Sequence, residues 1–230
     1  MQNMLLKYLN ERMEPKLNKP FEPGPVITIS RECGCSGRAV AQMLTEKINK
    51  SYKQEGKIQE WKWVNKEILR LASHELRMQP EKIKSLIQTQ EKNYFEEIVY
   101  SFTETYYGQN EMVKKVIEDV IRKIAVDGYT IIVGRGSGAI TRNIPKSLHI
   151  NLEAPLSWRA GIVSEKKKIS LNEARKHVIE VDKQRYNFKD YYRGKNNDDS
   201  CYDLSFNCKR LTNDEITDII FEIAAYRHIL

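Results

Sequence analysis

The chain has 230 residues, and its 38 Lys and Arg outnumber its 31 Asp and Glu to give a net charge of +7. This length suffices for one sizeable domain, and a charged fraction of 30% with apolar residues spread along the chain excludes a disordered protein. No apolar run approaches the roughly 18 residues that a membrane span needs. The basic balance suits anionic partners, and nucleotides are the small molecules that we expect.

The chain alternates short apolar strands with helices. A tail and linker, residues 1–24, hold a short amphipathic helix within 1–17 and precede a single domain, residues 25–230. Short β-branched runs predict strands, whereas apolar residues at helical spacing predict helices. The predicted strands cover residues 26–30, 61–64, 129–133, 147–152 and 202–206. The predicted helices cover residues 37–49, 66–73, 80–106 and 111–126, then begin at 155, 170 (ending near 186) and 212.

The alternation predicts an α/β fold in which a mainly parallel five-stranded sheet is covered by helices on both faces, making three layers. Two of the predicted helices, those at 170 and 212, begin at capping boxes, formed by Ser170 with Glu173 and by Thr212 with Glu215. Ligands of such sheets bind beyond the carboxyl ends of the strands. Two glycine loops, residues 30–38 and 134–138, follow predicted strands and should lie at that edge.

The first of these loops, residues 30–38, carries the clearest signal of a site. Glycine lets the backbone approach an anion closely, and the N–H groups and dipole at a helix start favour negative charge. Arginines flank the glycines and would add charge. An ordinary strand-to-helix turn, which needs glycine for its sharpness, is the alternative interpretation. The residues expected to contact phosphate are Arg31, Gly34, Cys35, Ser36, Gly37 and Arg38.

The loop departs from the Walker pattern G-x-x-x-x-G-K-[ST]. Set against a shorter form, G-x-x-G-x-G-K, Gly34 keeps its place, but Gly37 takes the lysine position. Ala39 takes the place of the hydroxyl that holds Mg²⁺. The positive charge for the phosphates must therefore come from elsewhere, and Arg31 and Arg38 are the candidates.

Five segments in order give the chain a resemblance to the cytidylate kinase-like family, within the P-loop nucleoside monophosphate kinase superfamily. They are residues 26–32, 63–69, 132–138, 182–185 and 202–207, and the resemblance extends over about residues 25–225. It implies a P-loop kinase-like fold with a helical acceptor insertion, about 66–126, and a lid-like region, about 166–200. The implied reaction is transfer of the γ-phosphoryl group of ATP, with Mg²⁺, to a pyrimidine nucleoside monophosphate.

The resemblance also implies roles for residues outside the first loop. Arg135 would contact the acceptor phosphate, with a surface ion pair as the alternative, and Arg159 and Arg185 would clamp the transferred group. For these last two a structural role is equally open. Asn65 and Asp182 fall in the acceptor region. Asn65 replaces the acidic residue that relatives carry, and Asp182 is expected to orient Arg185.

Two other functions stay open from the sequence. A nucleotide-binding sensor or regulatory protein without turnover is favoured by the missing lysine and hydroxyl. A nucleic-acid-binding protein is suggested by the charge and the aromatic residues, but no recognised motif supports it, so we expect no nucleic-acid partner. The helical stretch 80–126 could form a homodimer surface, although core packing explains its apolar stripe equally well.

The four cysteines indicate the compartment. The chain opens without the pattern of a secretory leader, so we expect a cytoplasmic protein with reduced thiols. Cys33 and Cys35 have neither the spacing nor the partner pair of a zinc site, and we predict no metal bound by the cysteines.

Overall fold

A computed structural model of the chain describes residues 23–65, 68, 111–193 and 201–230. The helix expected within residues 1–17 and the one over 80–106 lie outside the described residues, as does that over 66–73 apart from Ile68. No helix of the part that is described has the length and apolar character to cross a membrane.

The described strands form one five-stranded sheet in the order β2-β3-β1-β4-β5. Every neighbouring pair is parallel, so the predicted mainly parallel sheet is confirmed in its fully parallel form. Parallel strands place all their carboxyl ends at one edge, where both glycine loops emerge. The strands are β1 (Val26–Arg31), β2 (Lys62–Val64), β3 (Thr130–Val133), β4 (Ser147–Glu153) and β5 (Leu204–Asn207).

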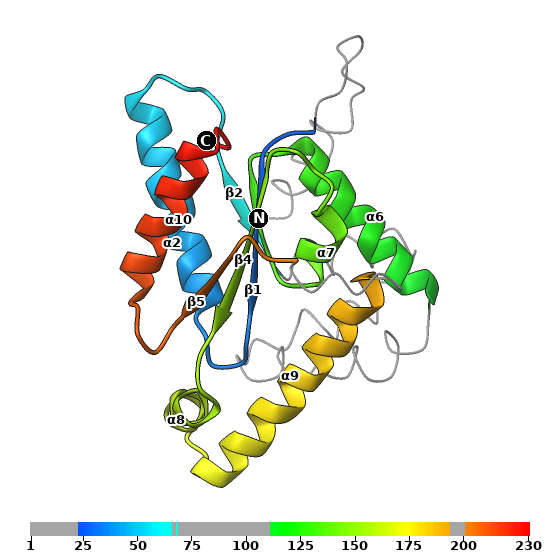
Figure 1. Cartoon of the computed structure of the whole chain (residues 1–230), viewed down its shortest axis with the longest axis vertical. Coiled ribbons are helices and arrows are strands. Elements are labelled where there is room, and N and C mark those ends of the chain that lie inside the picture. Colours follow the sequence, from blue (N-terminus) through cyan, green and yellow to red (C-terminus); the bar gives the residue numbers. More distant parts are fainter. Residues whose placement is uncertain (1–22, 66–67, 69–110, 194–200) are drawn as a thin grey trace, which may run out of the picture.

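Helices cover both faces of this sheet and one end of the molecule. Figure 1 shows α2 and α10 on one face, α6 and α7 on the other, and α8 with α9 beyond the carboxyl edge. The three expected layers are therefore present. The helices are α2 (Gly37–Gln54), α6 (Glu111–Asp127), α7 (Ser137–Thr141), α8 (Leu156–Lys167), α9 (Leu171–Arg193) and α10 (Asn213–Tyr226).

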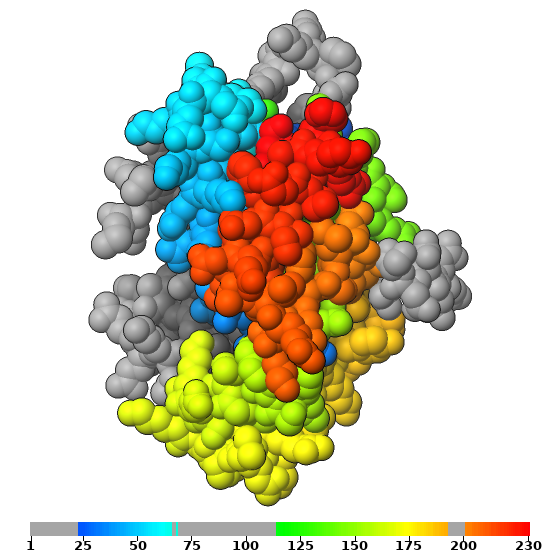
Figure 2. Space-filling model, turned by 60° about the vertical axis from the view of Figure 1, so that its left-hand side comes forward, coloured from blue at the N-terminus to red at the C-terminus, as the bar shows by residue number. Residues whose placement is uncertain are grey.

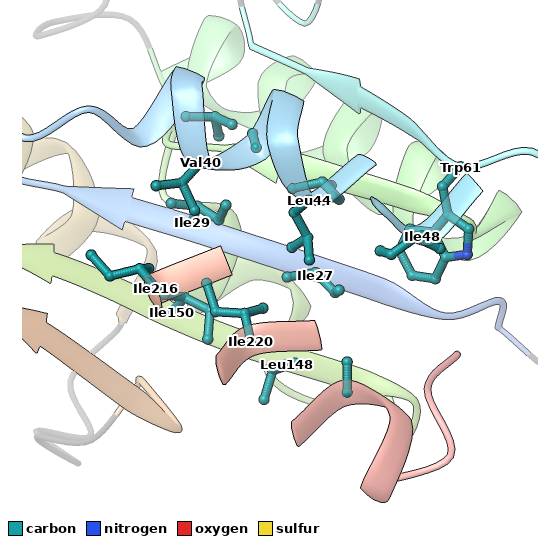
Figure 3. Close-up of a cluster of buried hydrophobic side chains, with 14 of the residues drawn as sticks. Ile27, Ile29, Val40, Leu44, Ile48, Trp61, Leu148, Ile150, Ile216 and Ile220 are labelled. Carbon is teal, nitrogen blue, oxygen red and sulfur yellow. The ribbon is translucent and has the colours of Figure 1, made fainter. Parts of the chain in front are cut away.

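The largest apolar cluster lies between the sheet and the helices α2 and α10. Val40, Leu44 and Ile48 recur at helical spacing and pack against the β1 side chains Ile27 and Ile29, all fully buried (Figure 3). Each such side chain contributes about 1.5–3 kcal/mol by leaving water. This packing fixes α2, and therefore the loop that precedes it, against the first strand.

A smaller cluster ties α8 and α9 to the first glycine loop, residues 30–38. It joins the loop residue Cys33 to Val163 of α8 and to Ala174 and Val178 of α9. Figure 2 shows the α8–α9 region as a lobe at one end of the molecule, beyond α2 and α10. Helices α8 and α9 thus rest directly on the loop.

Several elements differ from their predicted extent, among them α2, which ends at Gln54 instead of residue 49. Helix α9 continues to Arg193 because Phe188 and Tyr192 pack against the α6 cluster and the Tyr192 hydroxyl donates to the Lys114 carbonyl at 2.7 Å. The second glycine loop is shorter than expected, since α7 begins at Ser137. Gly134, Arg135 and Gly136 have φ values of 79°, 61° and 68°, and this left-handed run turns the chain sharply into the helix.

A buried polar network lies inside the sheet, away from the loops. The His149 ring contacts the Thr28 hydroxyl at 2.8 Å and the Ser147 hydroxyl at 3.0 Å. Ser147 donates its own proton to the Ile144 carbonyl at 2.7 Å, so it accepts from Nε2 and leaves Nδ1 to accept from Thr28. These contacts suit a neutral ring. Burial lowers the pKa of His149, and this effect exceeds the opposing attraction of Asp203.

The depressed pKa of His149 predicts a loss of stability in mild acid. The unfolded chain takes up a proton below about pH 6.5 while the folded ring stays neutral, so stability falls as the pH decreases through this range. Measured by urea denaturation, the free energy of unfolding should decrease less between about pH 7 and pH 5 for His149→Gln than for the wild type. Equal declines in both proteins would show that His149 does not control this pH dependence.

Candidate phosphate-binding site

A cavity of about 920 Å³ lies where the two glycine loops meet α8 and α9. Its lining includes eight Lys or Arg side chains but two acidic ones, Glu32 and Asp182. Such an excess of positive charge favours a ligand with several negative charges. The basic residues are Arg31, Arg38, Arg135, Arg159, Lys167, Lys183, Arg185 and Lys189.

Arg31 extends from the end of β1 between the two glycine loops. A Cβ atom built on Gly37 would lie 3.3 Å from Arg31 Cγ, and one built on Gly134 would lie 1.7 Å from Arg31 Nη1. The stem of Arg31 therefore covers the helix start where the usual loop carries lysine, and its guanidinium reaches the end of β3. Gly134 is needed for this path, whereas a side chain at Gly37 would require Arg31 to shift by only a few tenths of an ångström.

Among the described residues, the charged side chains that act most strongly on Arg31 are other arginines. Burial lowers the pKa of Arg31, and repulsion by Arg185, Arg135 and Arg38 lowers it further. Converging guanidinium groups repel one another in a partly desolvated place, so an anion bound among them would relieve the repulsion. Arg135 also has a left-handed backbone, which non-glycine residues seldom adopt and which recurs at binding sites.

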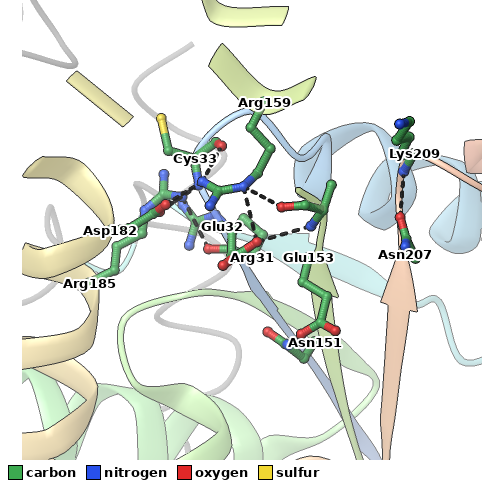
Figure 4. A network of polar contacts seen from close by, with 11 residues as sticks. Arg31, Glu32, Cys33, Asn151, Glu153, Arg159, Asp182, Arg185, Asn207 and Lys209 are labelled. Atoms are coloured by element: carbon green, nitrogen blue, oxygen red, sulfur yellow. Dashed lines mark hydrogen bonds and ion pairs between the residues drawn. The ribbon is translucent and has the colours of Figure 1, made fainter. Parts of the chain in front are cut away.

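Arg159 is held inside the protein and faces the loop. Its Nε donates to the Ala154 carbonyl at 2.7 Å and lies 3.1 Å from Glu32 Oε2. Its Nη1 donates to the Cys33 carbonyl at 3.2 Å and pairs with Asp182. Figure 4 shows the guanidinium between these acceptors. With 7% of its side chain exposed, Arg159 has the contacts of a structural residue that joins α8, α9 and the loop.

Helix α9 also bonds to the loop backbone. The Asp182 carboxylate accepts from the Cys33 N–H at 2.7 Å, and Arg185 donates to the Arg31 carbonyl at 3.1 Å. Asp182 lies 4.0 Å from Arg185, at the edge of an ion pair, and contacts Arg159 more closely. These bonds keep Arg185 beside Arg31, over the cavity.

The predicted site residues separate into two groups. Arg31, Arg38, Asn65, Arg135, Arg159, Asp182 and Arg185 line the cavity, whereas Gly34, Cys35, Ser36 and Gly37 are not part of its lining. Loop N–H groups are partly engaged already: that of Cys33 bonds to Asp182, that of Cys35 to the Glu32 carbonyl and that of Gly37 to the Cys35 carbonyl. The arginines, rather than the loop backbone, therefore make the stronger case for phosphate binding.

Several lining residues were absent from the sequence prediction. Glu32 accepts from the Ala154 N–H at 3.0 Å and pairs with Arg159, so it joins the loop to the end of β4. Lys189 lies 5.0 Å from the centre of the Tyr202 ring, and Asn151 of β4 also faces the cavity. Glu32, beside Arg31 in the loop, could have been noticed. No local sequence signal identifies Lys189 or Asn151 as a site residue, because only the fold brings them to the cavity.

The described donors fit poorly with a metal held by the protein. Mg²⁺ prefers carboxylate and hydroxyl oxygens. Within the described ranges no group of three His, Cys, Asp or Glu side chains could hold a metal. Glu32 and Asp182 are already bonded to Arg159 and to backbone N–H groups, and Ala39 stands at the hydroxyl position. The described side chains therefore form no magnesium site of their own.

Comparison with known proteins identifies the class and then the family. The parallel sheet order, with a glycine loop between the first strand and α2, is the arrangement of P-loop kinase-like folds. The model of the cytidylate kinase-like family matches residues 26–210, and the chain belongs to this family. No curated protein matches the chain.

One solved structure shares this fold, and two others give weaker alignments. An uncharacterized protein from Eubacterium ventriosum aligns with a TM-score of 0.59 at 20% identity, over 88% of this chain and 98% of that one. A shikimate kinase from Bacteroides thetaiotaomicron gives 0.49 at 9% identity, covering 86% and 97% of the two chains. The protein TT1252 from Thermus thermophilus gives 0.47 at 11% identity, covering 88% and 98%. The first of these shows the fold, and at 20% identity it shows nothing more.

Proposed function

We propose that the protein transfers the γ-phosphoryl group of ATP to a nucleoside monophosphate, with a pyrimidine nucleotide such as CMP as acceptor. The observation that carries the proposal is the convergence of Arg31, Arg38, Arg135 and Arg185 at the carboxyl edge of the sheet. Membership of the cytidylate kinase-like family supports the choice of donor and acceptor.

Three of these arginines then have a specific place in the reaction. Arg31 binds the donor phosphates in place of the missing loop lysine, because its stem covers Gly37. Arg135, at the end of β3, binds the acceptor phosphate, and Arg185 reaches the transferred group from α9. An acceptor oxygen attacks the γ-phosphorus and ADP leaves. The charge spread over the transferred oxygens is stabilised by the guanidinium groups, so positioning and electrostatics supply the catalysis.

A panel of nucleoside monophosphates tests this proposal. Purified protein is incubated with ATP and each acceptor, with magnesium and separately with excess EDTA, and the diphosphate products are separated. We expect transfer to CMP or a near relative among the pyrimidine nucleotides. Transfer to no acceptor, by a protein that binds ATP, would contradict a nucleoside monophosphate kinase.

A nucleotide-binding sensor without turnover is the second candidate. The specific observation in its favour is that Asp182 occupies the Cys33 N–H and that Ala39 stands at the hydroxyl position, so the loop lacks two groups of an ordinary kinase. Such a protein would bind ATP with micromolar or tighter affinity and form no product with any acceptor. The panel assay, with ATP binding measured on the same sample, separates the two candidates.

We also propose that the protein acts in the cytoplasm, where both nucleotides are at hand. The four cysteines support this location because none of them forms a disulfide. Fractionation of the source cells with an antibody against the chain is the direct test, and recovery outside the cytoplasmic fraction would contradict it.

A further inference from the structure

Asn65 follows β2 and lies between the ends of two other elements. It is 5% exposed. With its amide oriented to satisfy both neighbours, its nitrogen donates to the Val133 carbonyl at 3.2 Å and its oxygen accepts from Arg38 Nε at 3.0 Å. Both ends of the amide are thus bonded to the protein. Asn65 links the end of β3 to the start of α2.

The partner of this amide, Arg38, occupies an electrostatically unfavourable place. It is the second residue of α2, where the helix dipole is already positive, and the first turn of α2 contains no acidic residue. It also repels Arg31. The side chain is exposed and lines the cavity. A cation kept in this position is compensated when an anion binds beside it.

We propose that Asn65 is a positioning residue, which holds the Arg38 guanidinium at the phosphate site without neutralising it. An amide oxygen accepts the Nε hydrogen bond and leaves the full positive charge for the ligand. A carboxylate in this place would pair with Arg38 and cancel much of its charge. It would also set an oxygen against the Val133 carbonyl, where the amide now donates.

This inference rests on the proposed function, because it takes the ligand to be a nucleotide phosphate. It differs from a direct role for Asn65 in binding the acceptor. Each polar end of its side chain already has a protein partner, and the bond to Arg38 gives Asn65 a role that it exerts through Arg38. The amide that replaces the expected acidic residue therefore leaves the charge of Arg38 available to a ligand.

The test measures the binding of ATP by calorimetry at several salt concentrations for Asn65→Asp, Asn65→Ala and the wild type. Asn65→Asp should bind ATP about tenfold more weakly at low salt, because a charge-assisted contact to phosphate is lost. The difference in ATP affinity between Asn65→Asp and the wild type should be smaller at high salt, since exposed charges are then screened. Asn65→Ala keeps the charge and should show a smaller loss with the salt dependence of the wild type. Thermal unfolding of each variant checks that it is folded.

A second background shows whether Asn65 acts through Arg38. In Arg38→Ala protein, the further change Asn65→Ala should cause no additional loss of ATP affinity. This comparison also serves if Asn65→Asp fails to fold. Equal ATP binding by the wild type, Asn65→Asp and Asn65→Ala would overturn the inference alone, as would additive losses in the double variant. A wild type that does not bind ATP would overturn the proposed function and this inference together.

Discussion

Replacing Gly134 with alanine should slow phosphoryl transfer by at least about 100-fold, the usual cost of removing one group that stabilises transition-state charge. A Cβ atom at this position would lie 1.7 Å from Arg31 Nη1. Because this atom is the far end of a flexible side chain, the guanidinium should move out of the cavity while the fold survives. The assay compares single-turnover transfer from ATP by the variant and the wild type.

Gly56 provides a matched control for this variant. Its φ of 71° is close to the 79° of Gly134, but a Cβ atom on Gly56 would meet nothing within 4 Å. Gly56→Ala and Gly134→Ala should therefore each lose about 1–2 kcal/mol of stability through the left-handed backbone. Only Gly134→Ala should lose transfer. Undiminished transfer by Gly134→Ala would show that the observed position of Arg31 is not the working one.

Replacing Arg159 with methionine should reduce the free energy of unfolding by about 3 kcal/mol, as expected when one partner of a buried ion pair is removed. The change leaves Asp182 and Glu32 without their shared cation and leaves the Ala154 and Cys33 carbonyls without its donors. Helices α8 and α9 and the first glycine loop would then lose the side chain that joins them. Urea denaturation followed by circular dichroism measures the loss.

Arg122 is the matched control for Arg159. It lies on α6 with 53% of its side chain exposed and pairs with Glu118 one turn away. Arg122→Met should change stability by no more than about 0.5 kcal/mol. If Arg159→Met were as stable as Arg122→Met and yet lost transfer, Arg159 would be a clamp on the transferred group instead of a structural residue.

Much of the fold could be predicted because its signals are local. The β-branched run at residues 26–30 and the apolar spacing of Val40, Leu44 and Ile48 identify β1 and α2 without any tertiary information. Glu173 and Glu215 complete the capping boxes at Ser170 and Thr212, and α9 and α10 begin at the next residues.

The prediction was weaker where tertiary contacts decide the outcome. Helix α9 extends beyond its own apolar pattern because Phe188 and Tyr192 find partners on α6. Likewise, the sequence shows that Arg31 and Asn65 are unusual at their positions, but it does not show which residues their side chains contact. Arg31 crosses from one glycine loop to the other, and Asn65 bonds to Arg38. Both contacts depend on the parallel pairing of β1 and β2 with β3.

The most direct test of the account is calorimetric titration of ATP into wild type, Arg31→Ala and the control Arg122→Met. We infer that Arg31 supplies the charge of the missing loop lysine. We therefore expect the wild type and Arg122→Met to bind ATP equally and Arg31→Ala to bind at least about tenfold more weakly. Unchanged ATP affinity in a folded Arg31→Ala protein would contradict the claim that Arg31 forms the phosphate site.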